Sequence, residues 1–382
     1  MNTTETTAHR SAGHSVEIMG LPRTMSCVSK FVGPILLLLA SFGWTDPAMS
    51  SGDPIAGQSA YMQDCALCHG PRPSRSVLTA ANDPDLIGEH IMQIMIEEQD
   101  RWGSRPRFRV VGSFDDIAAY LASLVNYQGL WWSSPAGSES GWGINLAHQG
   151  DVIFATWFTY DLAGKGLWMV MTAPEVSTNV YSGILVSTTG PAFNATPFDS
   201  TQVAETPVGT GTLSFTDSDH GNFSYVVNGV SQTKAIIRQS FGRLPACSTA
   251  DDNLATATNY QDLWWASPGG SEAGWGISFS HQGDTIFATW FTYDVDRTPM
   301  WLVASAIKTA PGTYSGALYR TAGPPFNAVP FDPADVVTTP VGTATFTFSD
   351  GNNASFAYVV NGVAQVKAIT RQVFRSPGTM CH

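Results

Sequence analysis

Two patterns of hydrophobic and polar positions divide the chain. Between residues 52 and 125, apolar residues recur every three or four positions, as they do on one face of an α-helix. From residue 126 onward, short apolar runs alternate with Thr and Ser and end at Gly, Asn, Asp or Pro, which is typical of β-strands joined by tight turns. The sequence therefore predicts a small helical domain followed by a larger all-β region.

Three helices are predicted in the first region, over residues 53–70, 82–100 and 112–124. The first begins with Asp53 and Pro54, an N-cap residue followed by a proline at the first helical position, and the second repeats this Asp-Pro start. The third begins with Ser113 and Asp116 in the spacing of a capping box. A bound group buried among three short helices would supply much of the core of so small a domain.

The β region is one module present twice. The stretch "NYQGLWWSSPAGSESGWGINLAHQGDVIFATWFTYD" (126–161) aligns with "NYQDLWWASPGGSEAGWGISFSHQGDTIFATWFTYD" (259–294) at a constant offset of 133. Each copy predicts seven or eight antiparallel strands in sequence order, with a hairpin at "VNG" (227–229) in the first copy. An up-and-down barrel or a meander sandwich would remove the strand edges, and we favour the barrel.

The fold class is therefore a multidomain chain, with a small all-α domain and two tandem all-β modules, each an antiparallel barrel or a meander sandwich. The predicted boundaries are a signal peptide at 1–50, the helical domain at 51–125, module 1 at 126–247, a linker at 248–258 and module 2 at 259–382.

An apolar run lies near the N-terminus, in "KFVGPILLLLASFGW" (30–44). It is short for a bilayer span, follows Arg23 and Lys30, and precedes the small residues "AMS" (48–50) at a plausible cleavage site. We expect a secretory signal peptide; translation from Met25 would give it an ordinary length, and an uncleaved membrane anchor is the alternative. The mature protein is then periplasmic or secreted and not an integral membrane protein.

Composition narrows the partners of the β-modules. A net charge of −12 argues against nucleic acid and anionic membrane surfaces. Five tryptophans in each module either line a pocket for a glycan or an apolar ligand or pack in a core, and we favour the core. The single histidine beside each Gln-Gly-Asp turn, His148 or His281, fits turn chemistry better than a metal site. No catalytic triad, carboxylate pair or phosphate loop is evident.

The strongest chemical signal is "CALCHG" (65–70). Two thiols at this spacing can form thioethers with the vinyl groups of haem, and the adjacent imidazole can then bind the iron as proximal ligand. A redox CxxC site needs no histidine, and a zinc site needs a second ligand pair nearby. The motif therefore predicts one covalently attached haem c, held by Cys65 and Cys68, with His69 on the iron.

With this motif and "DDIAAYL" (115–121), residues 52–125 resemble a small class I cytochrome c domain. The resemblance implies electron transfer with a redox partner protein, and a distal ligand that is usually a Met in the loop before the last helix. Here that loop, 100–113, contains no Met. Met95 is the candidate, with Met92 or His90 as alternatives, and a five-coordinate iron is a further one.

The β-modules resemble a Trp-rich repeat ("SGWGI…HQGD…FATWFTYD") of secreted bacterial proteins of unknown role, so this resemblance brings no activity with it. Cys247 and Cys381 are the thiols left after the signal and the haem motif are set aside. In an oxidising compartment we expect them to form a disulfide within the chain. Two free thiols, or a bridge between two chains, are the alternatives.

These features together predict a periplasmic or secreted monohaem c-type cytochrome, an electron-transfer protein rather than an enzyme. Its β-modules would dock on a partner or bind a ligand or surface. Two alternatives stay open: a secreted binding protein with an auxiliary haem, and a haem enzyme of peroxidase type if the distal position is open.

Overall fold

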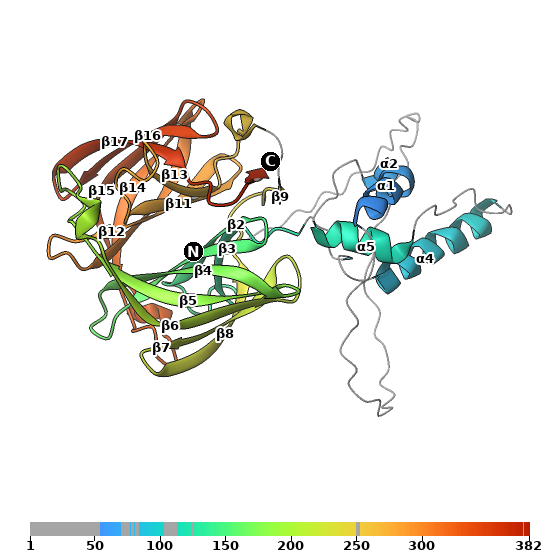
Figure 1. Ribbon diagram of the computed structural model, residues 1–382, viewed down its shortest axis with the longest axis horizontal. Coiled ribbons are helices and arrows are strands. Elements are labelled where there is room, and N and C mark those ends of the chain that lie inside the picture. Colours follow the sequence, from blue (N-terminus) through green and yellow to red (C-terminus); the bar gives the residue numbers. More distant parts are fainter. Residues whose placement is uncertain are drawn as a thin grey trace, which may run out of the picture. The chain divides into compact units, whose positions relative to one another are not determined.

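The computed structural model describes residues 54–69, 77, 80, 84–102, 113–123, 125–249, 253–376 and 378–382 (Figure 1). The predicted signal peptide, its alternative start at Met25 and most of the predicted loop 100–113 lie outside the described residues. None of the described helices is both long enough and apolar enough to cross a membrane.

Helices occupy the three stretches that the apolar periodicity predicts. They are α1 (Pro54–Asp64), the short α2 (Ala66–His69), α4 (Pro84–Trp102) and α5 (Phe114–Ser123). Pro54 and Pro84 stand at the first position of their helices, where an N–H would have no partner within the helix. Ser113 immediately precedes α5 and caps its first turn, because its hydroxyl accepts the N–H of Asp115 at 3.1 Å.

One apolar cluster joins α1, α4 and α5. Its buried members are Ala60, Tyr61, Ile87, Ile91, Ile117, Ala118, Tyr120 and Leu121. The rings of Tyr61 and Tyr120 lie 5.6 Å apart, where α1 meets α5. Gly57 allows this close approach, because a Cβ at this position would lie 1.8 Å from the carbonyl oxygen of Asp116.

Replacing Gly57 with alanine is expected to destabilise the helical domain by about 1–3 kcal/mol, since a backbone carbonyl must move to admit the methyl group. Gly88→Ala in α4 is the matched control, because its Cβ would meet only the edge of the Phe114 ring, at 3.1 Å. That control gains helix propensity and should be near neutral or stabilising. Helical circular dichroism during thermal unfolding measures both variants. Equal behaviour of the two would contradict the close crossing.

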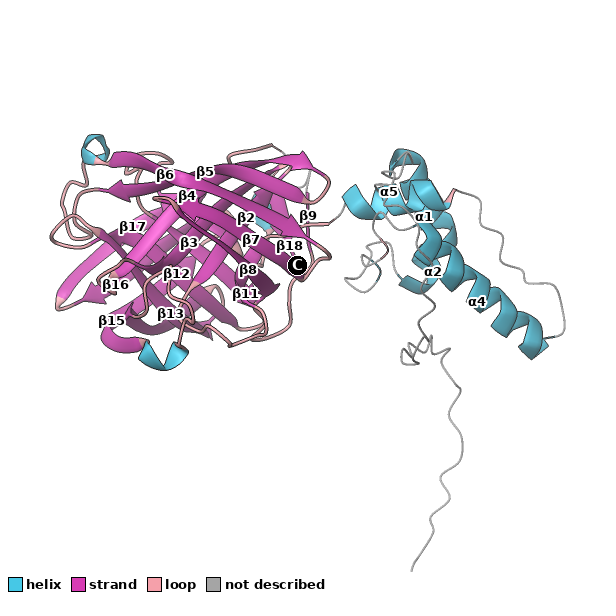
Figure 2. Ribbon diagram, turned by 90° about the horizontal axis from the view of Figure 1, so that it is seen from below, coloured by secondary structure: helices cyan, strands magenta, loops and turns pink. Residues whose placement is uncertain are grey.

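Each module forms a closed barrel of eight antiparallel strands, which confirms the barrel and rules out the meander sandwich (Figure 1). In module 1 the strands are β1 (Gly129–Ser133), β2 (Gly143–Gln149), β3 (Val152–Tyr160), β4 (Gly166–Ser177), β5 (Val180–Thr189), β6 (Ala204–Phe215), β7 (His220–Val227) and β8 (Val230–Arg238). In module 2 they are β10 (Asp262–Ala266), β11 (Gly276–Gln282), β12 (Thr285–Tyr293), β13 (Pro299–Ala310), β14 (Thr313–Ala322), β15 (Val337–Phe348), β16 (Asn353–Val360) and β17 (Val363–Arg371). Neighbours in sequence pair with each other, and the barrels close where β1 meets β8 and β10 meets β17. Figure 2 shows the strands of both modules in magenta; short 3-10 helices, such as Ser200–Gln202 and Pro333–Asp335, interrupt some of the connections between strands.

Local chemistry sets the register of the hairpins. Asn228 and Gly229 both have positive φ, 48° and 84°, so they form the tight two-residue turn that the sequence predicts between β7 and β8. Val227 and Val230 are paired directly across it. The equivalent strands of the two modules keep the same register at the offset of 133, so their side chains face equivalent directions.

The barrel cores are aromatic. Trp157 lies 4.5 Å from the ring of Tyr225 in module 1, and Trp290 lies at the same distance from Tyr358 in module 2. These tryptophans are almost completely buried, as are Trp131 and Trp264. The tryptophans that recur at equivalent positions in both modules therefore serve mainly to fill the two barrels.

Candidate functional site

The CxxCH residues stand at the end of the first helix. Cys65 occupies the turn between α1 and α2, and the N–H of His69 donates to its carbonyl at 3.0 Å, so the two residues are one helical turn apart. The Cys65 side chain is half-buried and packs against the helical core. The side chains of Cys68 and Met95 lie outside the described part of the chain.

His69 is exposed as a residue, but its ring is partly desolvated by the surrounding protein. This partial desolvation lowers the pKa of the His69 imidazole, and the nearby His90 lowers it further. Neutral imidazole is the form that can bind iron. Of the alternatives for the distal ligand, Met92 and His90 are both exposed on α4.

The two described donors, the Cys65 thiol and the His69 imidazole, are of the types that haem attachment needs. Within the described ranges, no group of three or more His, Cys, Asp or Glu side chains is arranged to hold a bare metal ion. A c-type haem needs no such group, because thiols hold the porphyrin and a single imidazole holds one face of the iron. A partly buried thiol one turn from a neutral imidazole, beside an apolar core, suits that chemistry.

The two barrels complete each other's cores. The connection between β5 and β6 carries Phe193, whose ring lies 6.2 Å from Trp290 of module 2. Its counterpart between β14 and β15 is Phe326, whose ring lies 6.0 Å from Trp157 of module 1. Each loop is thus inserted against the other barrel, and the buried residues of both modules form one continuous cluster.

Hydrogen bonds repeat this exchange in both directions. The indole of Trp168 donates to the carbonyl of Thr292 at 3.0 Å, and that of Trp301 donates to the carbonyl of Thr159 at 2.9 Å. All four residues obey the offset of 133. The modules are therefore related by a pseudo-two-fold axis, as in a symmetric homodimer.

The C-terminal segment of each module is anchored to the other one. The side-chain oxygen of Gln149 accepts the N–H groups of Phe374 and Arg375, at 2.9 and 3.1 Å. Its counterpart Gln282 accepts two N–H groups from residues 241–242 in the same way. These segments then lead to a two-stranded sheet formed by β9 (Cys247–Thr249) and β18 (Thr379–Cys381).

A disulfide joins Cys247 and Cys381 across this sheet, with an S–S distance of 2.08 Å. The two cysteines face each other directly in the register. They close equivalent ends of the two modules, so the bond lies near the pseudo-two-fold axis. Strand β9 includes residues 248 and 249, the first two of the predicted linker 248–258, because pairing with β18 keeps them extended.

His148 and His281 do more than shape turns. The Nδ1 atom of His148 accepts the N–H of Tyr127, and its Nε2 lies 3.3 Å from the hydroxyl of Tyr181. His281 repeats these contacts in module 2 and also bonds the Gly283 carbonyl of its own turn. Burial lowers the pKa of each ring to about 4. The imidazoles are neutral structural links between strands and turn, and turn chemistry was only part of their role.

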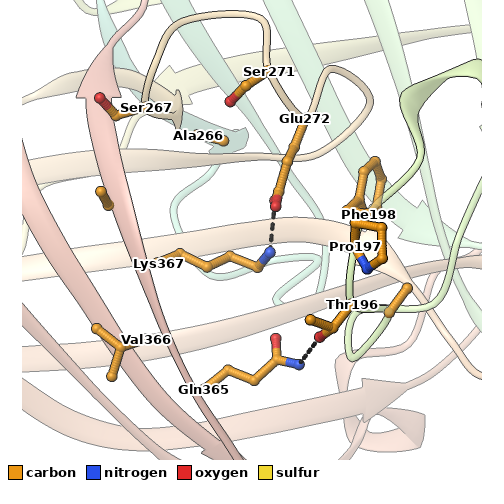
Figure 3. Close-up of a pocket in the computed structure, with 12 residues that line it drawn as sticks. Thr196, Pro197, Phe198, Ala266, Ser267, Ser271, Glu272, Gln365, Val366 and Lys367 are labelled. Carbon is orange, nitrogen blue, oxygen red and sulfur yellow. Dashed lines mark hydrogen bonds and ion pairs between the residues drawn. The ribbon is translucent and has the colours of Figure 1, made fainter.

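A pocket of about 360 Å³ lies between the modules (Figure 3). Its walls are the loop before β6, the connection that follows β10, and strand β17. The ammonium of Lys367 lies 2.6 Å from Oε2 of Glu272, and 5.3 Å from the centre of the Trp275 ring. The Trp275 indole donates to the same carboxylate oxygen at 2.9 Å. The pocket therefore combines a neutralised ion pair with hydroxyl and apolar side chains.

Sequence reasoning missed the inserted loops and this pocket. A signal for the loops was present, since "TTGPAFNATPFD" (188–199) and "TAGPPFNAVPFD" (321–332) place phenylalanines among Gly and Pro at matching positions. An aromatic residue in a Gly- and Pro-rich loop has no core of its own module to enter, which favours burial elsewhere. The pocket had no comparable signal, because its walls come from distant segments of two modules.

No family model matches the chain, and no curated protein gives a significant match. Among solved structures, a crystal structure of a mutant of the vaccine antigen transferrin-binding protein B from Haemophilus parasuis Hp5 is similar over 60% of this chain and 66% of that one. The chain thus spans a little under two thirds of that protein. The identity is 10% and the TM-score 0.17, and a likeness of this size carries no argument about function.

Proposed function

We propose that the chain is an exported monohaem c-type cytochrome that transfers single electrons, and that its paired barrels are a rigid unit for docking or binding. One observation carries the proposal: within a CxxCH motif, Cys65 packs against an apolar three-helix core and lies one helical turn before His69. The haem, when bound, supplies the one-electron change of its iron.

The chain's own residues would hold and shield that group. Cys65 and Cys68 would each add a thiol S–H across a vinyl group, which gives two thioethers. His69 would present its neutral ring to the iron, since burial and His90 both lower its pKa. The apolar cluster of α1, α4 and α5 would limit access of water. Met95, Met92 and His90 stay the predicted choices for the distal side.

The paired barrels support a docking or binding role rather than catalysis. The loops that a barrel could use to close over a substrate are already inserted against the other module. The disulfide and the reciprocal hydrogen bonds further restrict movement between the barrels. A rigid double barrel is suited to presenting a fixed surface to a partner.

Removal of the two motif thiols tests the proposal. The protein made in a strain competent for c-type haem maturation is expected to keep haem on a denaturing gel, and Cys65→Ala with Cys68→Ala is expected to lose it completely. Cys247→Ser with Cys381→Ser is the control, because it removes two thiols of the modules and should leave the haem attached. Haem that migrates with the motif variant, or an intact protein without haem, would refute the proposal.

The absorption spectrum of the same sample separates electron transfer from the peroxidase alternative. A low-spin, six-coordinate iron that is reversibly reduced supports electron transfer, since both axial positions are then filled. A high-spin iron with an open position supports peroxidase chemistry instead. The binding-protein alternative is favoured by the pocket beside Glu272, which has a test of its own.

A further inference from the structure

The pocket beside Glu272 marks a difference between two otherwise equivalent modules. In module 1, the hydroxyl of the buried Ser133 accepts the N–H of Glu139 at 2.9 Å and the hydroxyl of Ser138 at 3.1 Å. In module 2, the residue equivalent to Ser133 is Ala266, which has no hydroxyl. The acceptor that organises this loop in module 1 is therefore missing in module 2.

The missing hydroxyl leaves two donors at the pocket wall. They are the N–H of Glu272 and the hydroxyl of Ser271, and neither has a protein acceptor among the described residues. Both residues line the pocket, as does Ala266 itself (Figure 3). A ligand oxygen placed beside Ala266 could accept both hydrogen bonds, just as the Ser133 hydroxyl does in module 1.

The charged groups of the pocket offer an acceptor and donors without a net charge. Lys367 and Trp275 both bond Oε2 of Glu272, so its Oε1 is left for a ligand hydroxyl to donate to. The ammonium of Lys367 has further N–H groups beyond the one that it gives to Glu272. Because the ion pair cancels its own charge, the pocket favours a neutral ligand.

The opposite wall is apolar and comes from module 1. Pro197 and Phe198 of the inserted loop lie across the pocket from the ion pair, whereas Val366 of β17 lies on the side of module 2, near Gln365 (Figure 3). The amide of Gln365 is fully used, since it donates to the carbonyl of Asn194 and to the hydroxyl of Thr196 at 3.0 and 3.2 Å. These two hydrogen bonds hold the inserted loop of module 1 in place, so the wall that contains Pro197 and Phe198 is formed before a ligand binds.

We propose that this pocket binds a neutral hexose unit, either a free sugar or the end of a glycan. A hexose carries hydroxyls that both donate and accept, and C–H faces that can lie on Pro197 and Phe198. The volume of about 360 Å³ is at the lower end of the range of small-molecule sites, roughly 300–1,000 Å³. The site goes beyond the proposed electron transfer and does not depend on it.

Titration of the full-length protein, whether or not it carries haem, tests the site. The probes are the methyl glycosides of glucose, galactose, mannose and N-acetylglucosamine, used in calorimetry up to about 10 mM, where weak ligands still bind measurably. An array of immobilised glycans ending in the same hexoses tells a free sugar from a glycan end. At least one probe is expected to bind with a stoichiometry of one per chain.

Two matched variants locate the binding. Ala266→Ser gives module 2 the hydroxyl of module 1 and is expected to weaken binding by about tenfold or more, because the ligand oxygen loses its two donors. Ser133→Ala makes the reverse change in module 1 and should leave the measured affinity unchanged. Circular dichroism and tryptophan fluorescence verify that the modules of both variants are folded. The proposal is overturned if no probe binds, if Ala266→Ser binds as the parent does, or if the loss follows Ser133→Ala.

Discussion

Replacing Arg371 with leucine is expected to lower the free energy of unfolding of the β-modules by about 3–5 kcal/mol. Arg371 lies 3.0 Å from Asp262, and the exposed fractions of the two side chains are 1% and 0%. Without the guanidinium, the carboxylate would be left charged in a site that water does not reach. Burial already raises the pKa of the Asp262 carboxyl with its partner present.

Protonation of Asp262 sets an upper limit on the loss of stability in the Arg371→Leu variant. The carboxyl can escape its buried charge by taking up a proton, and from an ordinary pKa of 3.8 this costs about 4 kcal/mol at pH 7. In the variant, the folded state then holds a proton that the unfolded state has released. A group of raised folded pKa is most favourable at low pH, so the deficit of the variant should shrink as the pH falls from 7 toward 4.

Module 1 supplies the control. Gly129 takes the place of Asp262 there, and Arg238 takes the place of Arg371. Each arginine also donates to three backbone carbonyls, so both leucine variants lose equivalent bonds. Arg238 pairs instead with Asp219, whose side chain is 36% exposed and can be solvated. Arg238→Leu should therefore cost less, and its cost should not shrink at low pH in the same way.

Urea unfolding followed by tryptophan fluorescence measures both variants. The double variant Arg371→Leu, Asp262→Gly gives module 2 the residue pattern of an Arg238→Leu module 1, and it should recover the difference between the two single variants. An equal cost in both modules, or a double variant less stable than Arg371→Leu alone, would show that the buried carboxylate is not the source of the effect.

Local hydrophobic patterns in the sequence predicted most helices and strands. The features that the sequence did not predict, the inserted loops and the exchanged C-terminal segments, depend on contacts between distant segments. The offset of 133 and the alternating strands were sufficient to predict two equivalent modules, and closure of strand edges favoured the barrel. Nothing in one copy says where its neighbour lies. The inserted Phe193 and Phe326 and the exchanged C-terminal segments depend on the pseudo-two-fold axis, which arises only when both copies fold together.

Among the candidate sites too, local motifs could be predicted from the sequence, and features that depend on contacts between distant segments could not. The CxxCH motif is local, so its spacing alone indicates its chemistry, and the helix that precedes it, α1, follows from the Pro54 start and the apolar periodicity. The distal ligand depends on tertiary placement, and Met95 therefore stays a prediction. The pairing of Cys247 with Cys381 could be expected by elimination, but its position opposite in a two-stranded sheet could not. Ala266 became informative only when its hydrogen-bonded counterpart Ser133 was seen.

The β-modules are expected to lose stability steeply as the pH falls from about 6.5 to about 4, because His148 and His281 are buried as neutral rings. The unfolded chain takes up a proton on each ring near pKa 6.5, whereas the folded state resists protonation until about pH 4. The unfolded state therefore binds more protons inside this window, and the free energy of unfolding falls with pH there. Above 6.5 the contribution is complete, and below 4 no more is lost.

The difference of about 2.5 pKa units corresponds to about 3–4 kcal/mol for each histidine, or about 7 kcal/mol for the two modules together. Burial is the main cause of both shifts. Arg238 strengthens the shift of His148 and Asp151 opposes it, while Lys308 and Asp284 act likewise on His281. Because burial is the largest cause of both shifts, we expect the two buried rings to supply most of the slope.

The variant His148→Asn, His281→Asn is the decisive comparison. The Oδ1 atom of asparagine can take the place of Nδ1 and accept the N–H of Tyr127 or Tyr260, so the main backbone contact survives. The variant should be less stable at pH 7, because it loses ring packing against the neighbouring tyrosines. Its urea midpoint should nevertheless change far less between pH 6.5 and 4 than that of the parent. If both proteins lose stability with the same slope, protonation of these two rings is not what limits the modules in acid.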